Sequence, residues 1–294
     1  MTENFKPSYK SKTPRLSKED YAKMKKEEKD KVYKMLDDTT VEVLSDVGKY
    51  QEFLETQSRI NKYSTSNALL IYNQCPNASK LKDFNEWKAE GASVEKGKKG
   101  IYILEPYDYV DKDGNTRKSY NTKKVFDVSQ TNKKDKAFKS FTKKPVDFAK
   151  NLIDSSHLEC ETVDVIPRSP NSAAFYDVAT NQLLVKRGVG DEVKIANDLA
   201  KEVAHIELAY KNEEYNRDDY EFKAKSIAYM ICKKYGIDTT YIDINQVPEN
   251  LSTLEPKKSR NELSLMRVKL NDINNEINMA SEKERASKEK DYSR

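Results

Sequence analysis

The stretch Leu199-Ala200-Lys201-Glu202-Val203-Ala204-His205 has the spacing of a zinc-binding helix whose first ligand is missing. Two histidines four residues apart share one helix face and bind a metal ion, and a glutamate after the first histidine acts as general base. Here the first position is Lys201, and a protonated lysine has no lone pair to donate. The chain holds one further histidine, His157. The motif therefore argues against zinc-dependent hydrolysis and predicts a protein without a metal or other cofactor.

Around this stretch, the second half of the chain alternates helical and strand-like patterns. Two helices are expected over Glu192–Tyr210 and Tyr220–Tyr235, the second closed by Gly236 at a C-cap position. A helix near Pro145–Ile153 and three short strands precede them; the strands are expected at Thr162–Ile166, Ala173–Tyr176 and Leu183–Val185.

The first half begins with a polar segment and ends in a hairpin. We expect a helical segment near Lys18–Leu36, a separate helix capped by Thr39 or Thr40, and a buried helix over Asn67–Gln74. The dipeptide Asp113-Gly114 is a strong hairpin signal. The flanking strands are expected at Ile101–Leu104, Tyr107–Val110 and Val125–Val128.

The two halves of the chain differ in net charge. Residues 1–150 carry 32 Lys and Arg against 23 Asp and Glu, a net charge of +9, whereas residues 151–294 carry 21 against 26, a net charge of −5. A basic half favours a polyanionic partner, although a solvated lysine-rich surface gives the same count. No run of the sequence approaches the roughly 20 apolar residues of a membrane span, and the N-terminus lacks a secretion signal. The three cysteines form no CxxC pair. These features predict a cytoplasmic protein with reduced thiols and no membrane partner.

Four parts are expected along the chain. They are a basic flexible or helical arm (1–38), a small α+β domain (39–144), a second α+β domain (145–250) and a C-terminal amphipathic helix (255–294), with the polar segment Lys133–Lys144 as the boundary between the domains. The last helix carries apolar residues at alternating spacings of three and four: Leu263, Met266, Leu270, Ile273 and Ile277. This seam is short for a coiled coil, so we expect it to pack on its own domain, with homodimerisation as the alternative.

A series of short motifs occurs in order between Val41 and Thr131. They include Tyr63-Ser64-Thr65-Ser66-Asn67-Ala68-Leu69-Leu70, Pro76-Asn77-Ala78, Lys96-Gly97-Lys98-Lys99-Gly100-Ile101 and Val125-Phe126-Asp127-Val128-Ser129-Gln130-Thr131. Together they resemble the N-terminal domain of ArdC-type antirestriction proteins, which conjugative plasmids and other mobile elements carry. The resemblance implies binding of single-stranded DNA without sequence specificity and protection of incoming DNA from restriction.

Motifs of the second half resemble the metallopeptidase-like domain of the same family. They are Phe175-Tyr176-Asp177 with Asn181, the helix at Lys201–His205, Ala224–Tyr229 and Tyr235–Thr239. The resemblance implies an α+β zincin-like fold over about Pro145–Asn250.

The metal site of that family is altered in this sequence. Of its HExxH pattern only Glu202 and His205 remain, and the family's glutamates on the next helix, one of them the third ligand, correspond to Lys223 and Lys225. Cations in place of two ligands would repel a metal ion. The sequence therefore predicts a vestigial, catalytically dead site. The alternative is an active zinc peptidase with rearranged ligands, for which Glu221, Asp219 or Asp218 could supply a carboxylate.

Lysines and aromatic residues alternate in the basic half, as a single-stranded DNA surface requires. We expect Trp87 and Phe84 to lie in the core and the tyrosines of the hairpin to be exposed. The candidate nucleic-acid-binding residues are Lys80, Lys82, Lys88, Lys96, Lys98, Lys99, Tyr107, Tyr109, Arg117, Lys118, Tyr120, Lys123 and Lys124.

These observations predict the α+β class, with a small DNA-binding domain, a zincin-like domain and a C-terminal helix. The favoured function is non-sequence-specific binding of single-stranded DNA in antirestriction or conjugation, by a protein that is a pseudo-metallopeptidase and not an enzyme. The alternatives are an active metallopeptidase and an interaction module that recruits restriction, replication or conjugation proteins. The sequence does not separate antirestriction from strand protection or priming.

Overall fold

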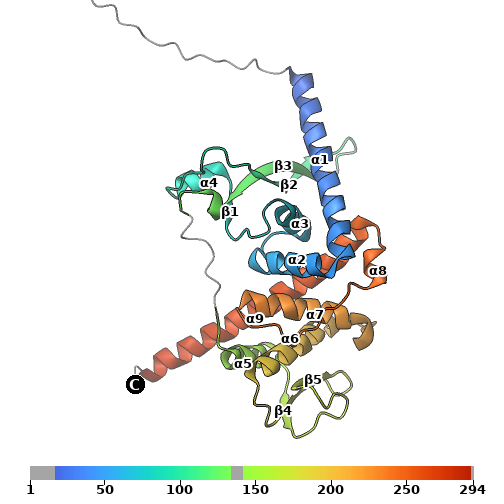
Figure 1. Ribbon diagram of the computed structural model, residues 1–294, viewed down its shortest axis with the longest axis vertical. Helices are drawn as coiled ribbons and strands as arrows, with labels where there is room; N and C mark the ends of the chain where they lie inside the picture. The colour runs from blue at the N-terminus through green and yellow to red at the C-terminus, as the bar shows by residue number, and fades with distance from the viewer. Residues whose placement is uncertain (1–16, 134–141, 293–294) are drawn as a thin grey trace, which may run out of the picture.

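The computed structural model describes residues 17–133 and 142–292, with side chains up to residue 282, and its fold is α+β with a long C-terminal helix (Figure 1). The first half contains α1 (Lys18–Ser45), α2 (Val47–Arg59), α3 (Thr65–Gln74), β1 (Leu81–Lys82), α4 (Phe84–Ala89), β2 (Ile101–Val110), β3 (Thr116–Asp127) and the 3₁₀ turn η1 (Val128–Gln130). The second half contains α5 (Pro145–Ser155), β4 (Cys160–Val163), β5 (Ala174–Asp177), β6 (Gln182–Lys186), α6 (Glu192–Ala209), α7 (Arg217–Lys234), α8 (Glu249–Ser252) and α9 (Pro256–Tyr292).

Helix α1 is longer than the sequence suggested, and the expectation that Thr39 or Thr40 begins a new helix is wrong. Both threonines are buried inside α1, and their hydroxyls donate to the carbonyls of Met35 and Leu36, at 2.7 Å each. A threonine hydroxyl can be satisfied by the carbonyl four residues earlier, so these residues do not interrupt the helix. The following helix is capped instead by Asp46. Residues 1–16 of the expected arm lie outside the described part of the chain.

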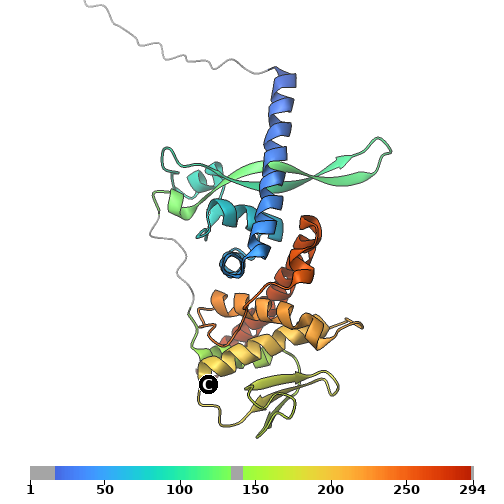
Figure 2. The same cartoon turned by 45° about the vertical axis from the view of Figure 1, so that its right-hand side comes forward.

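A long antiparallel hairpin dominates the first half. The sequence predicted separate strands at Ile101–Leu104 and Tyr107–Val110, but β2 is one continuous strand that pairs with β3 from Ile101↔Val125 to Val110↔Thr116. Its turn contains Asp113-Gly114 as expected, with Gly114 at φ 82°. Figure 2 shows the twisted ribbon crossing α1 and extending beyond it. The short β1 pairs with the other edge of β3, giving the strand order β1-β3-β2.

Two amides of α3 cover the free edge of β2. Asn67 accepts from the amide of Leu104 at 2.8 Å and donates to its carbonyl at 3.0 Å. Gln74, seven residues later on the same helix face, does the same with Tyr102 at 2.9 and 3.0 Å. The two side chains satisfy backbone groups that a neighbouring strand would otherwise pair. This explains why an amide stands at each end of the Asn67–Gln74 segment.

The second half contains a small mixed sheet beside two helices. Its strand order is β4-β6-β5, with β4 parallel and β5 antiparallel to β6. The observed strands and helices agree with the predicted ones to within a few residues. Gly236 lies after α7 at φ 69°, which confirms its predicted C-cap role. Cys232 is buried as expected, and all three cysteines are free.

Helix α9 holds the two halves together. The residues of its apolar seam, Leu263, Met266, Leu270, Ile273 and Ile277, are at most 3% exposed, and α9 packs against α1, α3, α5, α6 and α7. The seam is therefore filled within one chain, as predicted, and a dimer through α9 would need other residues. Direct contacts also join the halves: Tyr50 of α2 stacks on Phe222 of α7 and hydrogen-bonds Ser226 at 2.9 Å.

One buried hydrophobic cluster contains residues from both halves. The division into domains near residue 144 stays a prediction, because the halves share this core and residues 134–141 lie outside the described chain.

Among the helices that the structure describes, none has the length and apolar character that crossing a membrane requires.

Candidate functional site

The residues of the metal-site motif lie where α6 and α7 pack against each other. Glu221 of α7 faces two of them: its Oε1 is 3.2 Å from Nζ of Lys201, and its Oε2 is 2.9 Å from Nε2 of His205. Lys201 Nζ is also 3.7 Å from Oε1 of Glu202. His205 and Glu202 are almost completely buried, at 0% and 1% exposed. Lysine at the first ligand position is thus the centre of an ion-pair cluster.

Glu202, which would be the general base in an active site, is held by another cation. Nη2 of Arg217 lies 2.7 Å from both of its oxygens, and Oε2 also accepts the amide hydrogen of Tyr176 at 2.8 Å. The Arg217 guanidinium lies 4.4 Å from the centre of the Phe175 ring. Each carboxylate oxygen therefore has a charged or polar donor, which is the condition for burying the charge. Both oxygens of Glu202 thus already accept hydrogen bonds from the protein.

Both ring nitrogens of His205 lie within a chain of hydrogen bonds. The hydroxyl of Tyr215 lies 2.8 Å from Nδ1, and burial raises the pKa of this tyrosine, which keeps it protonated. An ionised carboxylate can only accept, so Nε2 of His205 donates to Glu221, and the Tyr215 hydroxyl is the partner of Nδ1. Burial tends to raise the pKa of Glu221, but the hydrogen bond from His205 and the charge of Lys201 outweigh it and lower the pKa to about 2. Both imidazole nitrogens are occupied, and Glu221 is ionised at neutral pH.

These residues do not fit a zinc ion. Zinc needs deprotonated donors with free lone pairs, whereas Lys201 offers an ammonium and Nε2 of His205 carries a hydrogen. Within the described ranges there is no group of three or more His, Cys, Asp or Glu side chains that could hold a metal ion.

Helix α7 presents to the site Glu221, the residue that the sequence offered as an alternative carboxylate. The register predicted Lys223 or Lys225 at the third ligand position, but the side chain facing His205 is Glu221. Lys223 turns away to Glu262 of α9, at 2.7 Å, and Lys225 remains near the site, 3.7 Å from Glu221. Arg217 was not identified from the sequence. Its position one helical turn before Glu221, on the same face of α7, is the signal that could have found it.

The candidate nucleic-acid-binding residues of the hairpin lie on two faces. Paired residues of antiparallel strands point to the same side, so Tyr107 and Tyr109 share a face with Arg117, the partner of Tyr109. Tyr120, paired with Pro106, lies on the opposite face together with Lys118 and Lys124. All three tyrosines are exposed, at 40%, 43% and 40% for Tyr107, Tyr109 and Tyr120. The rings of Tyr107 and Tyr109 lie side by side, 6.3 Å apart.

Several of the candidate cations are engaged by the protein itself. Lys80 and Lys82 pair with Glu90 and lie over the Trp87 ring. Arg117 pairs with Asp111, Lys123 with Asp83 and Glu105, and Lys98 with Glu95 at 3.7 Å. Lys124 lies 4.7 Å from the centre of the Tyr102 ring. The candidates that form no ion pair with any described residue are Lys88, Lys96, Lys99, Lys118 and Lys124.

The remaining motif residues have structural roles. Trp87 is buried, as expected, and donates to the carbonyl of Phe126 at 2.8 Å, but Phe84 is 56% exposed, so its expected place in the core is wrong. Phe84 is the first residue of α4, where its side chain falls outside the small Trp87 cluster. Buried Asp127 accepts the amides of Ser79, Lys80 and Ser129 at 2.7 to 3.0 Å. It therefore anchors the turn between β3 and the segment before β1.

Comparison with other proteins finds a family model and a curated relative that match the sequence. The family described as the N-terminal domain of anti-restriction factor ArdC matches residues 22–143. An uncharacterized protein of Bacillus anthracis, pXO2-81, is 24% identical over 286 residues, covering 77% of this chain and 48% of that protein. The chain thus spans about half the length of this curated relative.

Crystal structures of the antirestriction ArdC protein from plasmid R388 are also similar. The metal-free form is 16% identical with a TM-score of 0.45, and the Mn(II)-bound form is 14% identical with a TM-score of 0.44. Each match covers 75% of this chain and 84% of the ArdC chain. Residues 22–143 of this chain are therefore similar to the N-terminal domain of the anti-restriction factor ArdC.

Proposed function

We propose that this protein binds single-stranded DNA without base preference and protects incoming DNA from restriction, acting in the cytoplasm. The observation that carries the proposal is the projecting hairpin, on which Tyr107 and Tyr109 expose neighbouring rings. Exposed aromatic rings stack on bases of any sequence, and nearby lysines contact the backbone. Lys96 and Lys99 at the base of the hairpin, and Lys118 on the face opposite to Tyr107 and Tyr109, have no acidic partner among the described residues, so their charges are available to phosphates.

The antirestriction role is supported by the family match and not by the hairpin alone. The matched domain is that of an anti-restriction factor, so its partners would include DNA and components of a restriction system. Replication or conjugation proteins are further candidate partners.

We propose further that the α6–α7 cluster is not a peptidase site and holds no zinc. The support is that Glu202 is occupied by Arg217 and that Lys201 lies within 3.2 Å of Glu221, the carboxylate nearest to His205. The cluster then stabilises the packing of α6 on α7.

The first prediction concerns the dependence of DNA binding on salt. If about four to six phosphates are neutralised, the logarithm of the affinity for a dT oligonucleotide should fall with the logarithm of salt at a slope of about −3 to −4. Replacing Lys96, Lys98 and Lys99 together by alanine should reduce the magnitude of this slope by about 1 to 2. Fluorescence anisotropy over a series of salt concentrations measures both.

A matched control removes the same number of charges from the second half. The variant Arg168→Ala/Arg187→Ala/Lys211→Ala loses three exposed cations there and should keep the slope of the unmodified protein. An affinity independent of salt, or equal slopes for the lysine variant and the control, would contradict the proposed phosphate contacts.

A further inference from the structure

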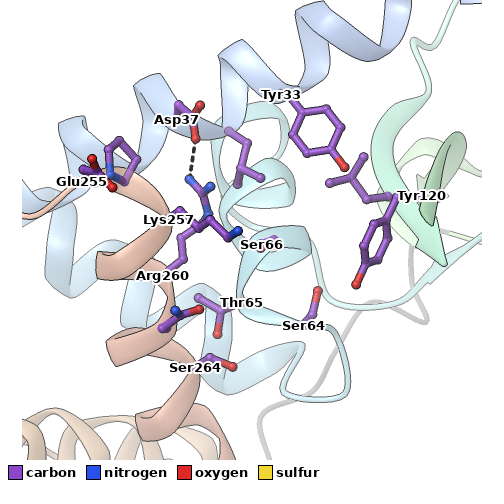
Figure 3. Close-up of a pocket in the computed structure, with 14 residues that line it drawn as sticks. Tyr33, Asp37, Ser64, Thr65, Ser66, Tyr120, Glu255, Lys257, Arg260 and Ser264 are labelled. Atoms are coloured by element: carbon purple, nitrogen blue, oxygen red, sulfur yellow. Dashed lines mark hydrogen bonds and ion pairs between the residues drawn. The ribbon is translucent and has the colours of Figure 1, made fainter. Parts of the chain in front are cut away.

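A cavity of about 750 Å³ lies between the two halves of the chain. It is lined by α1, by the first residues of α3, by the hairpin and by the first residues of α9 (Figure 3). Tyr120, on the hairpin face opposite to Tyr107 and Tyr109, lines this cavity together with Leu104 of the same face. The cavity is thus continuous with one side of the proposed DNA-binding hairpin.

Two helix N-termini open into this cavity. Ser64 caps α3, and the amides of Thr65 and Ser66 at its start have no acceptor within the helix. Helix α9 starts with Pro256, which has no amide hydrogen, and Lys257, and both line the cavity from the other half. The positive ends of helices favour anionic groups and present free amides to them. The chemistry of these two ends suits a phosphate.

A buried hydroxyl gives independent support for a ligand. The side chain of Thr65 is part of the cavity lining and only 2% exposed, yet its Oγ1 has no hydrogen-bond partner. An unpaired buried hydroxyl costs free energy, and such groups are rare in folded proteins. A ligand oxygen in the cavity would provide the missing partner.

The charged residues of the cavity are balanced. Arg260 donates through Nη1 to Asp37 at 2.6 Å and to Thr40 at 3.1 Å, and its other N–H groups make no hydrogen bond with the described residues. In Figure 3 its side chain extends from α9 towards Asp37 and the start of α3. Lys257 adds a second cation, while Asp37 and Glu255 are the acids in the lining. Two cations and two carboxylates therefore line the cavity, and the unbonded N–H groups of Arg260 are the donors that could reach a single phosphate.

Aromatic rings form the wall next to the hairpin. Tyr33 of α1 and Tyr120 of β3 line the same side of the cavity (Figure 3). Tyr120 is 40% exposed, so its ring is accessible. Tyrosine rings beside a phosphate subsite are the combination that holds a nucleotide in a single strand, because the base stacks while the phosphate is hydrogen-bonded.

We propose that this cavity binds one nucleotide, with its phosphate at the start of α3 against Thr65 and Arg260 and its base against Tyr33 and Tyr120. The proposal rests on the proposed function, because it names a subsite for the same DNA. It also assigns a role to α9, which supplies Arg260 and Lys257 from the opposite half of the chain. The second half would thereby contribute to DNA binding without any metal chemistry.

The test is the variant Thr65→Val in the full-length chain. Valine keeps the shape of threonine but removes the unpaired hydroxyl, so the melting temperature should stay equal or rise. Affinity for a dT oligonucleotide of about 12 nucleotides should fall about tenfold, because a hydrogen bond to a charged phosphate is lost. The opposite directions of the two changes separate a ligand contact from a structural role, which would lower both.

The control is Thr39→Val, which removes a buried hydroxyl that is already bonded to Met35. It should leave DNA affinity unchanged and should not raise the melting temperature. Free dTMP is tested beside the oligonucleotide. If Thr65→Val loses affinity for the oligonucleotide alone, the ligand of the cavity is the DNA strand. If Thr65→Val also loses affinity for dTMP, the cavity binds a free nucleotide. If the unmodified protein binds the oligonucleotide and Thr65→Val binds it equally well, the subsite is disproved while the proposed function stands. If the unmodified protein binds neither ligand, the proposed function itself fails.

Discussion

Replacing Arg217 by methionine should lower the free energy of unfolding by about 3 kcal/mol. The substitution keeps most of the apolar stem but leaves the Glu202 carboxylate, 1% exposed, with only the Tyr176 amide and the distant Lys201 ammonium. Removing one partner of a buried ion pair costs more than the pair contributes, because the remaining charge stays desolvated. Urea denaturation of the variant and the unmodified protein at neutral pH measures the difference.

A double variant serves as the control for this effect. Arg217→Met/Glu202→Gln removes both charges, so it should regain most of the stability lost in the single variant. Equal losses in the two variants would show that packing of Arg217 over Phe175, and not its charge, stabilises the site. A loss below about 1 kcal/mol in Arg217→Met would contradict the buried ion pair.

The single substitution Lys201→His should create a zinc site. The new imidazole would lie four residues before His205 on the same helix face, with Glu221 already placed against both positions at 3.2 and 2.9 Å. Two histidines and one carboxylate are a sufficient protein ligand set for zinc. Saturating zinc should therefore stabilise the variant by about 2.7 kcal/mol at one hundred times its dissociation constant. Metal analysis and thermal unfolding with and without zinc measure this.

Two further variants determine which residues hold the ion. Lys201→Gln removes the ammonium without adding a ligand, and Lys201→His/Glu221→Gln removes the carboxylate, so neither should bind zinc. Peptidase activity should not appear in Lys201→His, because Arg217 still occupies Glu202. Stoichiometric zinc in the unmodified protein, or none in Lys201→His, would contradict the proposed arrangement of the cluster.

The helices and the hairpin could be predicted because their signals are local. Gly236 ends a helix and Asp113-Gly114 forms a hairpin turn through the backbone conformation of a few neighbouring residues. The apolar seam of α9 follows directly from the spacing of its residues. The joining of two expected helices into α1 could not be predicted, because Thr39 and Thr40 are good capping residues whose burial depends on tertiary packing.

The candidate sites depended on contacts between distant segments. Lys201 at the centre of the altered motif was identified from its type alone, since an ammonium cannot be a ligand. The residue of α7 that meets His205 depends on the rotation of that helix, and a shift of two to four residues separates Lys223 and Lys225 from the observed Glu221. The cavity could not be predicted at all, because Thr65, Tyr120 and Arg260 meet only after α9 packs against both halves.

The most direct test of the account is the affinity of hairpin variants for single-stranded DNA. Tyr107→Ala/Tyr109→Ala should bind a dT oligonucleotide at least about tenfold more weakly than the unmodified protein at low salt, because two exposed stacking rings are lost. The matched control Tyr210→Ala/Tyr241→Ala removes two exposed tyrosines from the other half and should bind normally. Anisotropy titrations of the three proteins give the result. No binding by the unmodified protein, or equal affinities for all three, would contradict the claim that this hairpin binds single-stranded DNA.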